Sequence, residues 1–360
     1  MATIQEVSDL GQAVWLDYIS RSLITGGELR RLVYQGLRGV TSNPTILEKA
    51  VAAGGDYDEQ IGRLARQGKS PEEIYEAIVL QDIGSAADVL RPVHDRVGDG
   101  YVSLEVSPAL AHDTKATIAS ARRFFSALRR PNVFIKVPAT PEGFPAIEAL
   151  ISHGINVNVT LIFSLAQYEA AAEAYLSGLE KLVERAKDPS KVASVASFFV
   201  SRVDTAVDKA LEELGVTDLQ GKIAIANAKV AYARFREIFL GQRWDRLTAL
   251  GTRLQRPLWA STGTKNPKYP DTMYVDELIG PNTVNTVPPA TLEAFLDHGR
   301  ALPTIEVGLK QAKEQLARLG QLGISLDDIT EQLTTDGVTL FAKSYDALIA
   351  AIAEKSERLR

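Results

Sequence analysis

Polar residues that could do chemistry recur at the same relative place in several otherwise apolar segments of this sequence. They stand near the carboxyl ends of four segments with strand character, and they are Asp17, Glu105, Lys136, Asn158 and Thr160. Because side chains alternate across a strand with a period of two, Lys136 faces away from its aliphatic neighbours Ile135 and Val137. Burying an unpaired charge costs roughly 5 kcal/mol or more. A structural ion-pair network could explain any one of these residues, but the whole set favours a reactive site.

The reactive group in such a set is the lysine. An apolar pocket disfavours the ammonium form, so the amine of Lys136 becomes a usable nucleophile whose typical reaction is imine formation with a carbonyl. That reaction needs a proton donor and acceptor to remove the carbinolamine hydroxyl, and a later C–C cleavage needs a base. Asp17 and Glu105, with Thr160 and Asn158 to orient water and hydroxyls, meet these needs. The sequence therefore predicts metal-free aldol chemistry of the lysine-dependent kind.

Other reaction classes lack their residues. The chain has no cysteine, which excludes disulfides, thiolate catalysis, zinc thiolate sites and iron–sulfur clusters. Its four histidines show no ligand spacing, so a metal-dependent aldolase is disfavoured; they are His94, His112, His153 and His298. There is no G-x-G-x-x-G turn, no P-loop and no nucleophile elbow. We therefore expect neither a metal nor a cofactor.

Short strand-like runs alternate with longer helical stretches along the chain. The predicted strands are Ala13–Ile19, Gly39–Asn43, Tyr101–Val106, Val133–Ala139, Ile155–Leu161, Val192–Phe198, Pro257–Thr262 and Met273–Ile279. Eight strands with helical crossovers predict an α/β fold of the (β/α)8 barrel type with additional helices, and a doubly wound open sheet is the competing interpretation. Barrel active sites lie at the carboxyl ends of the strands, where the polar residues stand.

The stretches between the predicted strands have helical patterns. Ser70 precedes the predicted helix Pro71–Leu90, and Glu73 stands three residues after Ser70, which is a capping-box pattern. The predicted helices Leu165–Ala186 and Ser201–Leu214 are amphipathic. We expect the last helix, Leu340–Arg360, to pack on the barrel exterior. Residues 1–360 are then one barrel domain with an N-terminal extension, and Gly263–Asp271 is a functional loop rather than a domain boundary.

Bulk properties limit the partners and the location. The net charge of −5 gives no electrostatic reason to bind nucleic acid or an anionic membrane. Met1–Leu10 has neither the basic nor the apolar region of a secretory signal, and no apolar run approaches ~18 residues. We expect a cytoplasmic protein with small-molecule substrates, no nucleic-acid or membrane partner, and a monomeric or homodimeric state.

Five segments resemble one known family. They are Gly39–Ala50 (GVTSNPTILEKA), Val102–Ala109 (VSLEVSPA), Phe134–Gly143 (FIKVPATPEG), Gly154–Gln167 (GINVNVTLIFSLAQ) and Val195–Asp204 (VASFFVSRVD). In this order, with the T-x-N-P and I-K-V-P-A-T elements together, the sequence resembles the transaldolases. The segment Arg256–Pro289 is similar to the longer bacterial branch of that family.

The resemblance implies a (β/α)8 barrel that transfers a dihydroxyacetone unit in the non-oxidative pentose phosphate pathway. The donor would be sedoheptulose 7-phosphate or fructose 6-phosphate, and the acceptor glyceraldehyde 3-phosphate or erythrose 4-phosphate. A related fructose-6-phosphate aldolase, which releases free dihydroxyacetone, is the first alternative, and Glu105 favours the transaldolase over it. A non-catalytic sugar-phosphate sensor is a second alternative. A module of a fusion with an isomerase is a third, although we expect a transaldolase alone to fill 360 residues.

The resemblance also implies roles for individual residues. Lys136 matches the lysine that forms the Schiff base, and Asp17 matches the acid/base that takes the C4-hydroxyl proton during cleavage. Glu105, with Thr160, matches the group that handles the water lost and regained at imine formation.

Three further residues match the part of the family site that holds the dihydroxyacetone fragment. Asn43 and Asn158 correspond to groups that bind its hydroxyls. Thr41 lies beside them in the T-x-N-P turn, where a turn-stabilising hydroxyl and a catalytic one are equally good interpretations.

The phosphate site is the least uniform part of the resemblance. Ser197 and Arg202 match family phosphate contacts, and a guanidinium fork suits a phosphate dianion. Ser261 stands near the end of the seventh predicted strand. In the common branch of the family a serine at this place is followed closely by an arginine, and that arginine is absent here. Lys265, at altered spacing, is the candidate replacement, and Lys268 is the alternative.

Overall fold

The strands of this chain close into a parallel barrel. A computed structural model describes residues 2–360. The strands are β1 (Gln12–Leu16), β2 (Gly39–Val40), β3 (Tyr101–Glu105), β4 (Val133–Pro138), β5 (Val157–Ile162), β6 (Ser194–Phe199), β7 (Gln255–Ala260) and β8 (Thr283–Val287). Each strand pairs in parallel with the next, and β8 pairs back with β1. The (β/α)8 barrel prediction is confirmed, and the open doubly wound sheet is excluded.

The eighth strand was predicted at the wrong place. The segment Met273–Ile279 begins with a helix, α13 (Met273–Asp276), and the strand is Thr283–Val287 further along the chain. Tyr274 and Val275 are buried, and so are residues 278 and 279, which is helical rather than alternating spacing. A short apolar run in the sequence does not distinguish a helix from a strand. In the fold, Thr283–Val287 forms the strand because it makes a complete ladder with β1 and further pairs with β7.

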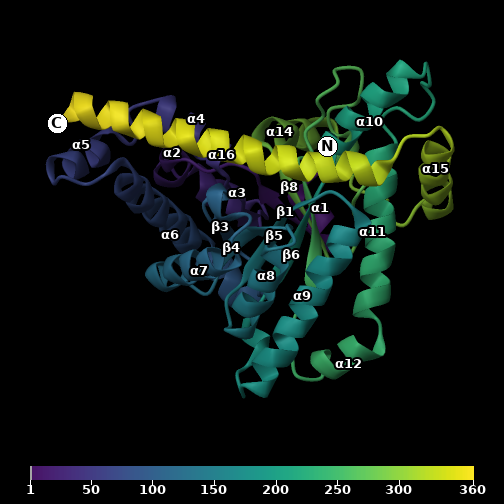
Figure 1. The fold of residues 1–360 in the computed structure, drawn as a ribbon, viewed down its shortest axis with the longest axis horizontal. Coiled ribbons are helices and arrows are strands. Elements are labelled where there is room, and N and C mark those ends of the chain that lie inside the picture. Colours follow the sequence, from purple (N-terminus) through teal and green to yellow (C-terminus); the bar gives the residue numbers. More distant parts are fainter. Residues whose placement is uncertain (1) are drawn as a thin grey trace.

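Helices surround the barrel, as Figure 1 shows. Besides α13 they are α1 (Ile4–Asp9), α2 (Arg21–Thr25), α3 (Glu28–Tyr34), α4 (Pro44–Ala52), α5 (Asp58–Arg66), α6 (Pro71–Val97), α7 (Thr114–Leu128), α8 (Gly143–Ser152), α9 (Leu165–Glu184), α10 (Ser201–Glu213), α11 (Ile223–Phe239), α12 (Gln242–Thr248), α14 (Pro289–His298), α15 (Leu309–Gln321) and α16 (Leu326–Leu359), with the short 3₁₀ helices Pro108–Leu110 and Pro189–Lys191. Within residues 2–360, no helix is both long and apolar enough to cross a membrane.

Helix α6 illustrates how local sequence sets these elements. The predicted capping box is present, since the hydroxyl of Ser70 accepts from the backbone of Glu73 and the Glu73 carboxylate accepts from the backbone of Ser70. The helix continues past its predicted end at Leu90 despite Pro92. It ends at Val97, and Gly98, whose φ is 71°, forms a left-handed cap after it.

The last helix differs most from its prediction. Helix α16 begins at Leu326, after the N-cap Ser325, rather than at Leu340. It packs against α4, α10 and the 3₁₀ helix Pro108–Leu110, and these elements follow the carboxyl ends of β2, β6 and β3. In Figure 1, α16 is the long yellow helix that crosses the molecule. It therefore lies over the carboxyl end of the barrel rather than only on the barrel exterior.

Aromatic side chains fill the lumen beneath the polar positions. Trp15 and Phe134 each precede a polar residue by two positions, so they share its inward face. The ring of Phe134 lies 4.3 Å from that of Tyr101 and 5.9 Å from that of Trp15, centroid to centroid. Gly39 makes space for the indole, because a Cβ atom there would lie 2.4 Å from the ring of Trp15.

We predict that Gly39→Ala lowers the free energy of unfolding by about 1–3 kcal/mol, because the added methyl overpacks the lumen against Trp15. Urea denaturation measures the change. Gly320→Ala is the matched control, since nothing lies within 4 Å of a Cβ there and alanine is favoured in a helix. Equal stability of the two variants would contradict the prediction.

Candidate active site

A cavity of about 70 Å³ opens at the carboxyl end of the barrel. It is lined by predicted site residues together with others that the sequence did not single out: Asp17, Thr41, Asn43, Lys136, Thr160, Ser197, Phe199, Arg202, Ala260, Ser261, Thr286 and Phe341. These come from seven strands or strand ends, from the first turn of α10 and from α16. The barrel thus brings together groups spread over more than three hundred residues of chain.

Lys136 and Glu105 form a buried ion pair beside this cavity. Their Cα atoms are register partners on β3 and β4, and the Nζ of Lys136 lies 3.0 Å from Oε2 of Glu105. The ammonium also donates to the carbonyl oxygen of Ser42 at 3.1 Å, and the ring of Phe341 lies 5.8 Å away. Only 6% and 7% of the two charged side chains are exposed. Strand register therefore fixes the acid beside the amine.

The environment of Glu105 favours its neutral form more than water does. Burial raises the pKa of Glu105, and the nearby Lys136 ammonium acts in the opposite direction. The charge of Asp17 adds to the rise. A carboxyl group whose pKa is raised in this way gives up its proton less readily than an ordinary glutamic acid.

Asp17 lies across the cavity just after the end of β1. Its backbone N–H donates to the carbonyl of Val287 at 2.9 Å, which continues the β1–β8 ladder, and its Oδ1 accepts from the Thr41 hydroxyl at 2.6 Å. The Thr41 oxygen also lies 2.6 Å from that of Thr286. Thr41 therefore contacts the acid rather than only stabilising its own turn.

Burial also raises the pKa of Asp17, while the hydrogen bond from Thr41 lowers it. The positive charges of Lys136, Lys265 and Arg202 lower it further. The two cavity acids thus have perturbed pKa values of the kind found where proton transfer is needed.

Three more predicted residues take different positions around the cavity. Thr160 lines it, and its buried hydroxyl has no hydrogen-bond partner within residues 2–360. Asn158 lies behind the wall, where it accepts from Ser197 at 2.7 Å and donates to Ser103 at 3.1 Å. Asn43 lines the cavity and also caps α4, because its Oδ1 accepts from the backbone N–H of Ile46 at 2.9 Å.

The candidate phosphate-binding groups lie toward one side. Arg202 extends between the rings of Phe199 and Phe341, with centroid distances of 5.4 and 5.7 Å. Ser261 has a left-handed φ of 56°, and its hydroxyl lies 2.9 Å from that of Ser201. Lys265 is exposed and outside the cavity, although its charge reaches Asp17.

Several lining residues escaped sequence reasoning for identifiable reasons. Phe199 stands two positions after Ser197, so a period of two would have placed it on the same face. Thr286 was hidden by the misplaced eighth strand. Phe341 lies in a long amphipathic helix, and nothing local to that helix indicates that one of its apolar residues reaches the barrel mouth.

The assembled chemistry is an amine, two perturbed carboxyl groups and an arginine around one small cavity. Among residues 2–360, no group of three or more His, Asp or Glu side chains could hold a metal ion. The family model described as Transaldolase/Fructose-6-phosphate aldolase matches residues 14–352. The chain belongs to this family.

Several named transaldolases are similar in sequence to this chain over nearly their whole length. A transaldolase of Thermobifida fusca is 49% identical over 98% of both chains. A transaldolase of Trichodesmium erythraeum is 45% identical over 98% of this chain and 97% of its own. A transaldolase of Saccharopolyspora erythraea is 46% identical over 100% of this chain and 99% of its own. The predicted family and enzyme class are confirmed: this is a transaldolase of the barrel type.

We predict that Phe341→Ala lowers kcat/KM of this transaldolase by about tenfold or more, because the ring shields Lys136 and Arg202 from water and orders both cations. It also costs about 3 kcal/mol of unfolding free energy. Phe295→Ala, a buried phenylalanine of α14, is the control for lost stability. The same kcat/KM in the two variants, assayed well below both transitions, would refute the shielding role.

Proposed function

We propose that this transaldolase transfers a dihydroxyacetone unit through an imine formed between Lys136 and the C2 carbonyl of a ketose phosphate. The observation that carries the proposal is the position of the Lys136 amine, in the cavity wall and 3.0 Å from the Glu105 carboxylate. The donors are sedoheptulose 7-phosphate and fructose 6-phosphate, the acceptors glyceraldehyde 3-phosphate and erythrose 4-phosphate, and the reaction belongs to the non-oxidative pentose phosphate pathway.

Imine formation begins when the neutral amine attacks C2. Glu105 takes the ammonium proton and returns it to the carbinolamine hydroxyl, which leaves as water. The free hydroxyl of Thr160 holds that water, and the same pair returns it at the end of the cycle. The raised pKa of Glu105 suits a group that must both accept and donate.

Cleavage then takes place at the C3–C4 bond. Asp17 removes the C4-hydroxyl proton, the C3–C4 electron pair moves into the iminium of Lys136, and the aldose phosphate leaves. The resulting enamine attacks the carbonyl carbon of the acceptor, and Asp17 returns the proton to the new alkoxide. Thr41 holds the Asp17 carboxylate in place by its 2.6 Å hydrogen bond.

Binding of the substrate uses the rest of the wall. We propose that Asn43 donates its amide to a dihydroxyacetone hydroxyl, since its Oδ1 is already used as a helix cap. Asn158 holds a hydroxyl of the same fragment, and Ser197, whose hydroxyl donates to Asn158, contacts the phosphate. Arg202, Ser261 and Lys265 take the phosphate. Because its charge reaches Asp17, we assign this role to Lys265 rather than to Lys268.

We further propose that residues 1–360 act as one barrel domain, in the cytoplasm, as a monomer or homodimer. The competing activity is that of a fructose-6-phosphate aldolase, which releases free dihydroxyacetone. Steady release of dihydroxyacetone from fructose 6-phosphate without an acceptor would favour that aldolase, whereas a single turnover that stops until an aldehyde is added supports the transferase.

Borohydride reduction in the presence of fructose 6-phosphate is expected to leave a three-carbon fragment on Lys136, because the enamine and its imine persist until an acceptor arrives. Peptide mass spectrometry locates the adduct. Lys229 is an internal control in the same digest, since it is equally buried and pairs with Glu277 at 3.1 Å. An unmodified Lys136 peptide, or equal labelling of Lys229, would overturn the mechanism.

The acid limb of the kcat–pH profile tests Asp17. The base must be ionised, so activity falls as pH drops through its pKa, and burial places that limb above the pH of an ordinary aspartate. Thr41→Val removes a hydrogen bond that lowers the pKa of Asp17, so the limb should move up by about one pH unit. Thr41→Ser keeps the hydroxyl and should leave the limb in place. A limb that stays put in Thr41→Val would exclude Asp17 as the base.

A further inference from the structure

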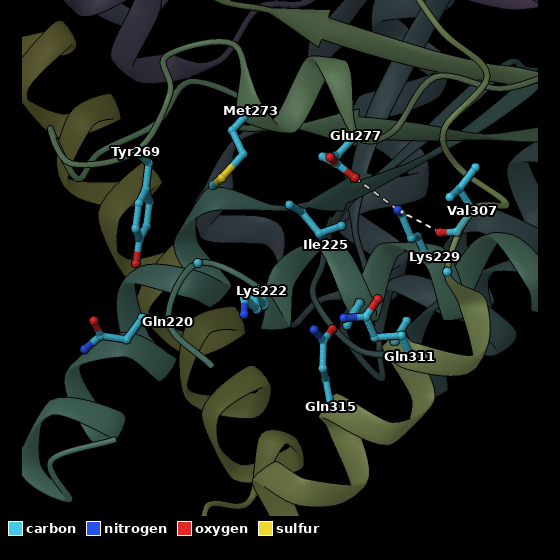
Figure 2. Close-up of a pocket in the computed structure, with 14 residues that line it drawn as sticks. Gln220, Lys222, Ile225, Lys229, Tyr269, Met273, Glu277, Val307, Gln311 and Gln315 are labelled. Carbon is cyan, nitrogen blue, oxygen red and sulfur yellow. Dashed lines mark hydrogen bonds and ion pairs between the residues drawn. The ribbon is translucent and has the colours of Figure 1, made fainter. Parts of the chain in front are cut away.

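The segment between β7 and β8, residues 263–279, is tied to the barrel's helices by polar side chains. The hydroxyl of Tyr269 donates to Asp208 at 2.6 Å, and that of Tyr274 donates to Asp204 at 2.8 Å. Further along, Glu277 accepts from the buried Lys229 of α11 at 3.1 Å. Figure 2 shows this last contact, together with Tyr269 on the wall of the pocket between α11 and α15. The segment is therefore held at several points.

Asp204 and Asp208 are the centre of this arrangement. They lie one turn apart on α10, so their side chains share a face. Each carboxylate also accepts a backbone N–H: Asp204 from Ala224 in the first turn of α11 at 2.7 Å, and Asp208 from Gly221 just before that helix at 3.0 Å. Each acid thus joins three segments of the fold: α10, the start of α11 and residues 263–279.

Fold stability alone does not explain why aspartates occupy positions 204 and 208. Only 1% of Asp204 and 8% of Asp208 is exposed, and burial raises the pKa of Asp204 to about 7. Well-packed apolar side chains would usually stabilise such a junction at least as well as two neighbouring buried acids. Directed hydrogen bonds instead fix the position and orientation of what they hold, which packing alone does less strictly.

The same helix carries a substrate-binding cation. Arg202 lies in the first turn of α10, two residues before Asp204, and reaches into the cavity. Lys265 lies on the tied segment and lines a small surface pocket with Asp204 and Asp208. Its charge also reaches Asp17. The two cations proposed to bind phosphate are therefore linked through the α10 carboxylates.

We propose that Asp204 and Asp208 are positioning residues that hold Lys265, through Tyr274 and Tyr269, at the separation from Arg202 that a substrate phosphate requires. The inference rests on the proposed phosphate site. Lysine binds phosphate as a point charge at the end of a flexible side chain. The position of the lysine backbone therefore decides how close the ammonium lies to its phosphate-bound position before the substrate arrives.

The test uses the ratio of kcat/KM for glyceraldehyde 3-phosphate to that for unphosphorylated glyceraldehyde, at saturating donor. This ratio reports phosphate recognition and does not depend on the fraction of active enzyme. Lys265→Gln should lower it by about tenfold, the loss of one charge-assisted contact. The double variant Tyr269→Phe/Tyr274→Phe should lower it by a similar factor, with kcat changed less than about twofold.

Tyr175→Phe is the matched control, because Tyr175 is also buried and donates to a backbone carbonyl, that of Arg253, at 2.6 Å. It should lower the melting temperature without altering the ratio. Adding Lys265→Gln to the double tyrosine variant should cause no further loss, since both changes act through the same cation.

The possible failures are distinguishable. If Lys265→Gln lowers the ratio and the double tyrosine variant does not, the positioning role is wrong and the phosphate site stands. Additive losses would show that the tyrosines act independently of Lys265, which also overturns the inference. If Lys265→Gln leaves the ratio unchanged, Lys265 does not bind phosphate, and the inference falls together with that assignment.

Discussion

Lys136 and Glu105 occupy paired positions on neighbouring strands, and their side chains meet at 3.0 Å in a part of the lumen that is nearly closed to water. This contact constrains the rest of the site. A buried ammonium without a counter-charge would strongly destabilise the barrel. The strand register meets this requirement, because it places the Glu105 carboxylate against the Lys136 side chain.

The surroundings of this pair explain how two acids and two cations coexist in so small a space. Aromatic rings fill the lumen below, where Phe134 stacks on Tyr101, and Phe341 of α16 closes it from above. Asp17 is held by its own hydrogen-bond partner, Thr41. Burial raises the pKa of both acids, and the charges of Lys136 and Arg202 lower both, but the hydrogen-bond partners differ: Thr41 for Asp17 and Lys136 for Glu105. The two acids therefore need not share one task.

Helix α10 joins two functions that lie on different segments of the chain. Its first turn presents Arg202 to the cavity, and its next turns carry the acids that tie residues 263–279. A cation on a surface segment that is already ordered loses less conformational freedom when it binds a ligand. The polar ties and the cavity wall therefore belong to one continuous piece of structure rather than to a binding site and an unrelated loop.

The sequence by itself determined the alternation of strands and helices, the shared parity of Asp17, Glu105 and Lys136, and the family, because alternation is a local property and the motifs are contiguous. The pattern left an open sheet possible, and the pairing of β8 with β1 is what closes the barrel. The sequence did not determine the eighth strand: Met273–Ile279 contains more apolar residues than Thr283–Val287 (TVNTV), and only pairing with β1 and β7 selects the second segment. It did not reveal Phe341, whose place depends on where α16 crosses the barrel, as the contact between Thr45 and Ser344 also does. Such contacts join residues some three hundred positions apart, and no periodicity within a helix records which distant segment it will meet.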